Sequence, residues 1–246
     1  MRTPDEVTEM AKRLFAEERA IRRLDGWFLT QEVWRDAAAK VAGLDDENAR
    51  AALLVEALKA IPLSVSDNAV FCGTQRDAFA RTYALINPTF KVEGFSGYCD
   101  PTAVYGDIEP NGEFSAARIA KMRQVAERSP LAVRLKAAYG RAEPWMKEVV
   151  FFAEQVTGHV IPDFRPALAR GVGALIDEAK AKGTSFHAAL ATALSGVTVL
   201  ADRYSAILRG KISGADSDAK GEYEEMLAVL EQVRLGPARS LRVAMQ

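Results

Sequence analysis

The feature that most constrains this fold is a helical spacing of apolar residues through nearly all of residues 115–246. Side chains three and four positions apart share one face of an α-helix, so a repeated apolar spacing predicts a buried stripe. Ser115 is expected to cap a helix to about Arg128, and a shorter helix is expected after Pro130. This half of the chain therefore predicts a helical body.

A polar corner between two predicted helices lies within residues 150–171. Gly158 stands where a C-cap glycine is expected, Pro162 cannot continue a helix, and Asp163 can accept a hydrogen bond from the free donors of the next helix. The apolar residues of the first helix are Trp145, Val149, Phe152 and Val156, and those of the second are Leu168, Val172, Leu175, Ile176 and Ala179. The corner holds His159, one of only two histidines in the protein.

Further helices are predicted toward the C-terminus. A long one starts at Thr184 or Ser185 and is expected to break at Gly210 and Gly214. Its apolar side carries Phe186, Leu190, Leu194, Val197, Tyr204 and Leu208. The next covers residues 216–235, with Tyr223, Leu227, Leu230 and Val233 in register. A last helix, beginning at Ala238, is cut off by the C-terminus, so we expect a longer fold to continue.

The first 62 residues also predict helices, over residues 5–24 and 30–42, with a third capped by Asp45 or Asp46 and stopped by Pro62. The third helix is expected to turn four apolar residues toward the core, namely Leu53, Leu54, Leu58 and Ile61. Dense charge on the first helix predicts a solvated face.

The pattern changes at residues 63–114. Leu63 and Val65 alternate with serines, Asp67-Asn68 favours a turn, and residues 69–72 predict a short buried strand before Gly73. Residues 73–114 are irregular and punctuated by glycine and proline, and so long a loop inside a compact domain is often functional.

Composition excludes several classes of function. Apolar residues make up 49% of the 246, and a net charge of -1 gives no electrostatic case for nucleic acid or an anionic membrane. No apolar run approaches the roughly 18 residues of a spanning helix, and no signal peptide is evident, so we expect a cytoplasmic protein. Cys72 and Cys99 lack metal-site spacing, which argues against structural zinc, and we expect both to be small buried residues.

Several stretches, in order, resemble the N-terminal region of glycyl radical enzymes, the pyruvate formate-lyase-like family. Arg13–Ala20 resembles the opening helix of that family with its Glu-Arg-Ala signature. Residues 49–75 are the closest match, resembling its helix, Ile-Pro, strand, acidic turn and hydrophobic segment ending in glycine. Gly158–Phe164, followed by a helix through Arg170-Gly171, resembles its Gly-His-x-x-x-Asp-Tyr/Phe element.

The resemblance implies a mainly α chain with a few short strands, forming the N-terminal part of a ten-stranded α/β barrel. It also implies that residues 1–246 form the N-terminal portion of a single pyruvate formate-lyase-like domain. Within that portion we expect helices over 1–62, a strand and a long irregular loop over 63–114, and helices over 115–246. The family's catalytic cysteine loop and glycyl radical domain are missing: neither Cys72 nor Cys99 has the Gly-Cys-Val-Glu type of context, and Ser96-Gly97-Tyr98 matches only the core of the radical motif.

The resemblance implies that this chain is the N-terminal portion of an anaerobic glycyl radical lyase or decarboxylase, which cleaves a bond in a small organic substrate. This chain would form barrel scaffold and part of the substrate cavity, with His159 as the substrate-binding residue and no catalytic or metal-ligating residue. It would need the remainder of the enzyme, would not be active alone, and would carry no cofactor itself. The complete enzyme would carry a glycyl radical installed by a radical SAM activating enzyme, and would form a homodimer.

Two alternatives stay open. In the first, the chain is a stand-alone helical binding or scaffold protein without catalysis. In the second, His159 is a helix-end histidine that contacts no ligand. His187, on an amphipathic helix, is expected to be structural or exposed.

Overall fold

The computed structural model describes residues 3–20, 25–41, 43–44, 46–65, 69–75, 110, 112, 115–127, 137 and 163–246. The chain divides into two units, Met1–Glu32 with Asp77–His159, and Val33–Arg76 with Val160–Gln246. The predicted helix after Pro130, the helix before Gly158 and residue His159 lie outside the described residues.

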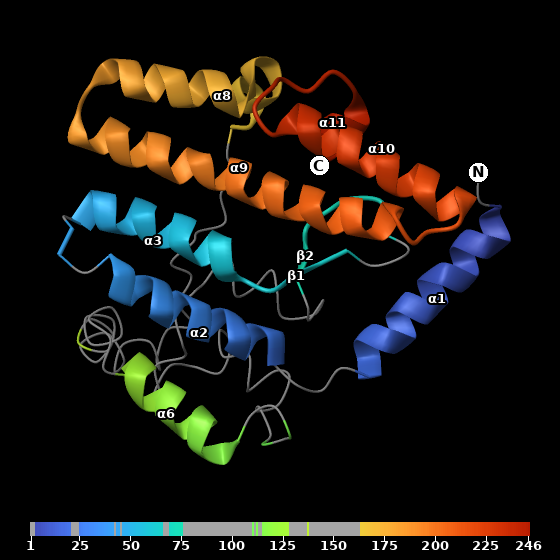
Figure 1. The fold of residues 1–246 in the computed structure, drawn as a ribbon, viewed down its shortest axis with the longest axis horizontal. Helices are drawn as coiled ribbons and strands as arrows, with labels where there is room; N and C mark the ends of the chain where they lie inside the picture. The colour runs from blue at the N-terminus through green and yellow to red at the C-terminus, as the bar shows by residue number, and fades with distance from the viewer. Residues whose placement is uncertain are drawn as a thin grey trace, which may run out of the picture. The chain divides into compact units, whose positions relative to one another are not determined.

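The described part is mainly helical (Figure 1). Its helices near the N-terminus are α1 (Pro4–Ala20), α2 (Asp25–Lys40) and α3 (Asp46–Ala60), and α6 (Ala116–Glu127) follows later. Ser115 caps α6 as predicted, because its Oγ accepts a hydrogen bond of 3.2 Å from the N–H of Arg118. Within the described residues, no helix combines the length and the apolar character that crossing a bilayer takes.

The second unit is built around one long helix. This is α9 (Ser185–Ile212), which packs against α3, α8 (Arg165–Lys182) and α10 (Ser217–Val233). In Figure 1, α8 and α10 lie along successive halves of α9, and α3 runs beside it. A short helix, α11 (Leu241–Met245), then packs on α10.

Capping side chains fix where α9 and α10 begin. Thr184 accepts a hydrogen bond from the N–H of His187, and Asp216 accepts one from the N–H of Ala219, so both predicted starts are confirmed. The predicted break at Gly210 is wrong, since α9 continues to Ile212. A helical glycine costs only about 1 kcal/mol, which packing along a long helix readily offsets.

One core cluster of the second unit lies between the second half of α9 and α10. Leu208 is fully buried there and Met226 almost so. The other buried members are Val65, Cys72, Tyr204, Tyr223 and Leu230. Burial of this kind contributes roughly 1.5–3 kcal/mol for each large apolar side chain, before the loss of conformational entropy is counted.

The end of α3 is joined to α9 by close packing and by one arginine. Leu58 and Ile61 are buried as predicted, whereas Leu53 and Leu54 are only half-buried and Ala57 takes a core position instead. The guanidinium of Arg203 donates to the carbonyl oxygens of Leu58 at 2.6 Å and Ile61 at 2.7 Å. These carbonyls lack helical partners at the end of α3, so the arginine acts as its cap.

A kink divides α8 at Gly171, where φ is +82° and ψ is 158°. The N–H of Gly173 donates to the carbonyl of Leu235 at 2.9 Å, and the N–H of Ala238 donates to the carbonyl of Leu168 at 2.9 Å. The chain between α10 and α11 thus lies directly against the backbone of α8, and a side chain at position 171 would overlap the backbone of Leu235 and Gly236.

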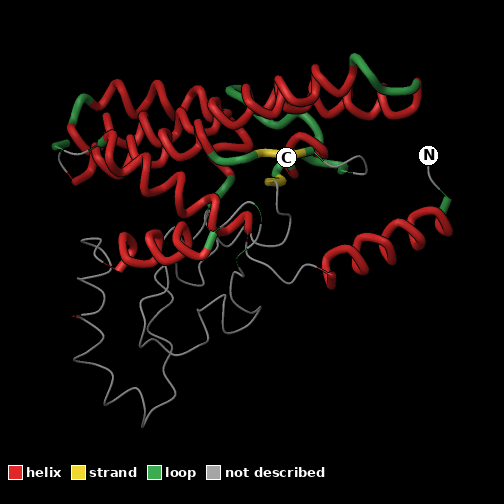
Figure 2. The backbone as a smooth tube through the Cα atoms, turned by 60° about the horizontal axis from the view of Figure 1, so that its bottom comes forward, coloured by secondary structure: helices red, strands yellow, loops and turns green. Residues whose placement is uncertain are grey.

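Two short antiparallel strands complete this unit. They are β1 (Leu63–Ser64) and β2 (Thr74–Gln75), with Leu63 opposite Gln75. The predicted strand at residues 69–72 is therefore wrong: Val70 is 49% exposed, and the strand lies two residues beyond Cys72. Figure 2 shows this hairpin beside the C-terminus. There the side-chain amide of Gln246 pairs with the backbone of Cys72.

Candidate functional site

The corner that carries the predicted substrate residue is described only from Asp163 onward. Asp163 Oδ1 accepts a hydrogen bond of 3.0 Å from the N–H of Arg165, so the predicted role of Asp163 at the start of the second helix is confirmed. The guanidinium of Arg165 also contacts both carboxylate oxygens, with Nε 2.8 Å from Oδ1 and Nη2 2.9 Å from Oδ2. The pairing is local and exposed, and Phe164 takes the N-cap position of α8 without a side-chain cap.

The same contacts favour the ionised form of Asp163. The side-chain hydrogen bond from Arg165, and then its backbone N–H, lower the pKa of the carboxyl. Asp163 is therefore a carboxylate at neutral pH, occupied by its neighbour and more than half exposed. It suits anchoring of the corner and is a poor proton donor. His159, four positions earlier, lies outside the described residues.

The second unit has a hollow of about 490 Å³ at the α8–α9 hairpin. Lys180, Thr184, Thr192 and Ser195 supply its polar lining, with Ile176 and Ala188 among its apolar residues. Such a set can bind by hydrogen bonds, but it holds no acid–base pair that could run a reaction. The hollow is open to solvent and was not predicted, because its residues come from two helices and share no motif.

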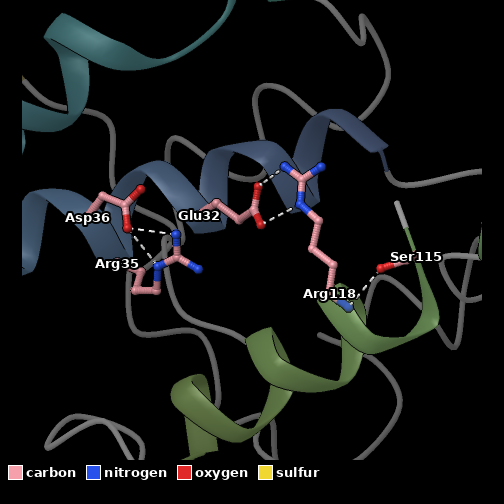
Figure 3. Close-up of polar contacts among 5 residues, drawn as sticks. All are labelled: Glu32, Arg35, Asp36, Ser115 and Arg118. Carbon is pink, nitrogen blue, oxygen red and sulfur yellow. Dashed lines mark hydrogen bonds and ion pairs between the residues drawn. The ribbon is translucent and has the colours of Figure 1, made fainter. Parts of the chain in front are cut away.

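In the first unit, a charged pair joins α2 to α6 (Figure 3). Arg118 donates from Nε to Glu32 Oε1 at 2.9 Å and from Nη2 to Glu32 Oε2 at 2.5 Å. The side chain of Glu32 is only 13% exposed and that of Arg118 37%, so the carboxylate of this two-point pair is largely shielded from water. Both groups are engaged by one another, which indicates a structural link. No sequence signal could have found a pair 86 residues apart.

Cys72 is buried, as predicted, and burial raises the pKa of its thiol to about 11. A thiol that stays protonated at neutral pH is a poor nucleophile. Among the described residues, no group of three His, Cys, Asp or Glu side chains could hold a metal ion. Cys99 lies outside them.

His187 belongs to the first turn of α9. Its Nδ1 is 2.7 Å from Thr184 Oγ1, and its ring stands edge-on to that of Phe186, with centroids 5.5 Å apart. The imidazole is thus engaged by its own helix start, which favours the structural one of the two roles predicted for it, structural or exposed.

Comparison with known proteins gives a consistent result. The family model described as Pyruvate formate lyase-like matches residues 27–246. No curated protein matches the chain. Among solved structures, one described for 1,2-propanediol dehydration in Roseburia inulinivorans has a TM-score of 0.66 at 17% identity, covering 89% of this chain and 30% of that one.

Two further structures share the fold. The glycerol-bound B12-independent glycerol dehydratase from Clostridium butyricum has a TM-score of 0.61 at 17% identity, covering 90% of this chain and 30% of its own. A glycyl radical enzyme from Archaeoglobus fulgidus has a TM-score of 0.65 at 14% identity, with coverages of 91% and 32%. This chain thus spans about a third of the length of the solved proteins it resembles.

Proposed function

We infer that this chain, which belongs to the pyruvate formate lyase-like family, is the N-terminal part of an anaerobic glycyl radical lyase. The observation that carries the proposal is the family match over residues 27–246, joined to a fold shared with three solved relatives at about a third of their length. In this proposal the chain supplies barrel scaffold and one wall of the substrate cavity. The cysteine loop and the radical glycine belong to the remainder of the enzyme.

The proposed substrate is a small hydroxylated molecule. Two of the solved relatives are described with 1,2-propanediol and with glycerol, which are small polyols. The complete enzyme would remove a hydrogen atom from such a substrate with a protein radical and then cleave a neighbouring bond. The glycyl radical would be installed by a radical SAM activating enzyme, in a cytoplasmic homodimer.

His159 is the residue proposed to contact the substrate. An imidazole can donate a hydrogen bond to a hydroxyl or accept a proton from it near neutral pH. The support for this role is the resemblance of Gly158–Phe164 to the Gly-His-x-x-x-Asp-Tyr/Phe element of the family.

The first test is the coding sequence that follows Gln246. It should supply, in the same or a neighbouring gene, a catalytic-cysteine loop and a C-terminal Arg-Val-x-Gly-Tyr-like stretch. The assembled enzyme, activated without oxygen, should then show the doublet signal of a glycyl radical by electron paramagnetic resonance. If neither gene encodes these elements, the chain is a stand-alone helical protein and the enzymatic proposal fails.

The second test concerns His159. In the assembled enzyme, His159→Ala should lower turnover strongly while leaving the radical signal and the melting temperature close to those of the parent. His187→Ala is the matched control, since that imidazole is engaged by Thr184, and it should keep turnover. An equal loss of folding and turnover in His159→Ala would assign His159 a structural role.

A further inference from the structure

One face of α9 is apolar along its whole length but buried along only half of it. Phe186, Leu190 and Val197 are spaced by four and seven residues, which places them on the same side of the helix. Their exposed fractions are 57%, 39% and 37%. We refer to these three residues as the α9 stripe.

The same face continues into the core. Tyr204 and Leu208 follow Val197 by seven and eleven residues, so they extend the α9 stripe along one line. They are 6% and 0% exposed, in the cluster that also holds Val65, Cys72 and Met226. This apolar face is thus buried at its C-terminal half and between 37% and 57% exposed at its N-terminal half.

The α9 stripe lies on the half of α9 that carries no charged residue of its own. Ser185 to Leu200 includes no Asp, Glu, Lys or Arg, whereas Asp202, Arg203 and Arg209 follow within the same helix. A helix that faces solvent normally places charged residues on its outer side. An uncharged outer face predicts contact with an apolar surface.

We propose that the α9 stripe is the docking surface for the part of the enzyme that lies outside this chain, which presents an uncharged apolar segment to it. The proposal rests on the proposed function. The solved relatives are about three times as long as this chain, which covers 30–32% of them. A larger protein buries a greater fraction of its surface. Apolar residues that are exposed in this chain would therefore become buried in a protein three times as long.

Photo-crosslinking in the complete enzyme tests the proposal. A benzophenone amino acid replaces Leu190 in one sample and Ala206 in a control. Ala206 is also exposed on α9, but it points about 160° away around the helix. We expect the probe at position 190 to form an adduct with a peptide encoded after Gln246, and the control to lose that adduct. An adduct within residues 1–246, an adduct with a second copy, or no adduct overturns the proposal.

The same samples separate this inference from the proposed function. A glycyl radical signal together with an adduct inside residues 1–246 refutes only the docking surface. If activation yields no radical signal and the coding sequence lacks the two radical elements, the proposed function fails and the docking proposal fails with it. As a second readout, Leu190→Glu with Val197→Glu should reduce assembly of the complete enzyme, while Ala206→Glu should not.

Discussion

The side chain of Gln246 forms a two-point pair with the backbone of Cys72. The N–H of Cys72 donates to Gln246 Oε1 at 3.0 Å, and Gln246 Nε2 donates to the carbonyl oxygen of Cys72 at 2.9 Å. An amide side chain here satisfies a donor and an acceptor that a neighbouring strand would otherwise satisfy. The pair ties the segment before β2 to the end of α11.

This pair should contribute measurably to stability. Gln246→Ala leaves two partly buried backbone groups without partners, and we expect it to lower the free energy of unfolding by about 1–2 kcal/mol. Urea denaturation measures the change. Met245→Ala is the control, because that side chain is 60% exposed and its truncation should have little effect. Equal stability of Gln246→Ala and the parent would contradict the prediction.

Arg203 should be more important for stability than Arg209, the other arginine of α9. Arg203→Met removes both donors to the carbonyls of Leu58 and Ile61, and we expect a loss of about 2–3 kcal/mol, since hydrogen bonds from charged groups are the stronger class. Arg209→Met removes an exposed ion pair with Glu231 and a weaker attraction to Asp202, and should change stability by less than about 0.5 kcal/mol. Thermal and urea unfolding distinguish the two variants, and comparable losses would refute the cap.

Gly171 should tolerate no side chain. The Gly171→Ala methyl group would overlap the backbone of Leu235 and Gly236, in a conformation whose strain alone costs about 1–3 kcal/mol. We expect loss of soluble protein or a large fall in melting temperature. Gly183→Ala is the matched control: its φ is also positive, at +66°, but nothing lies near its Cβ position, so it should cost only about 1–2 kcal/mol. The reverse order of stability would be inconsistent with this backbone contact.

Ionisation of the Cys72 thiol should lower the free energy of unfolding at high pH. Burial raises the pKa of its thiol from 9.0 to about 11. The unfolded chain therefore releases this proton first, and the folded state loses stability as pH rises from about 9 to 11. Denaturation in a Cys99→Ala background should show this decline, and the additional Cys72→Ala change should remove it. Below pH 9, Cys72 should resist alkylation until the protein unfolds.

Local chemistry explains which parts of this fold the sequence could predict. The cap at Ser115 and the helix starts near Thr184 and Asp216 depend on neighbours within three residues, and the structure confirms the cap and both starts. The strand assigned to residues 69–72 failed because the backbone of Cys72 pairs with a side chain 174 residues away. Spacing also showed the apolar face of α9 but not its partner, so it could not tell that the first half is bare.

The candidate site was predictable to a similar extent. The role of Asp163 at the start of α8 follows from its place beside the helix, whereas the pairing of Glu32 with Arg118 requires the tertiary fold. His159 remains a prediction that rests on family resemblance, because no described contact involves it.

The cap that Arg203 forms at the end of α3 also has a consequence for synthesis of the protein on the ribosome. Arg203 follows Leu58 by 145 residues and Ile61 by 142 residues in the chain. At roughly 5–20 residues per second, a ribosome needs roughly 7 to 30 seconds to make that interval. During that time Ala57, Leu58 and Ile61 have been synthesised, but α9, the helix that packs against them, has not. The nascent chain is therefore a natural client for chaperones that hold apolar segments until their partners emerge.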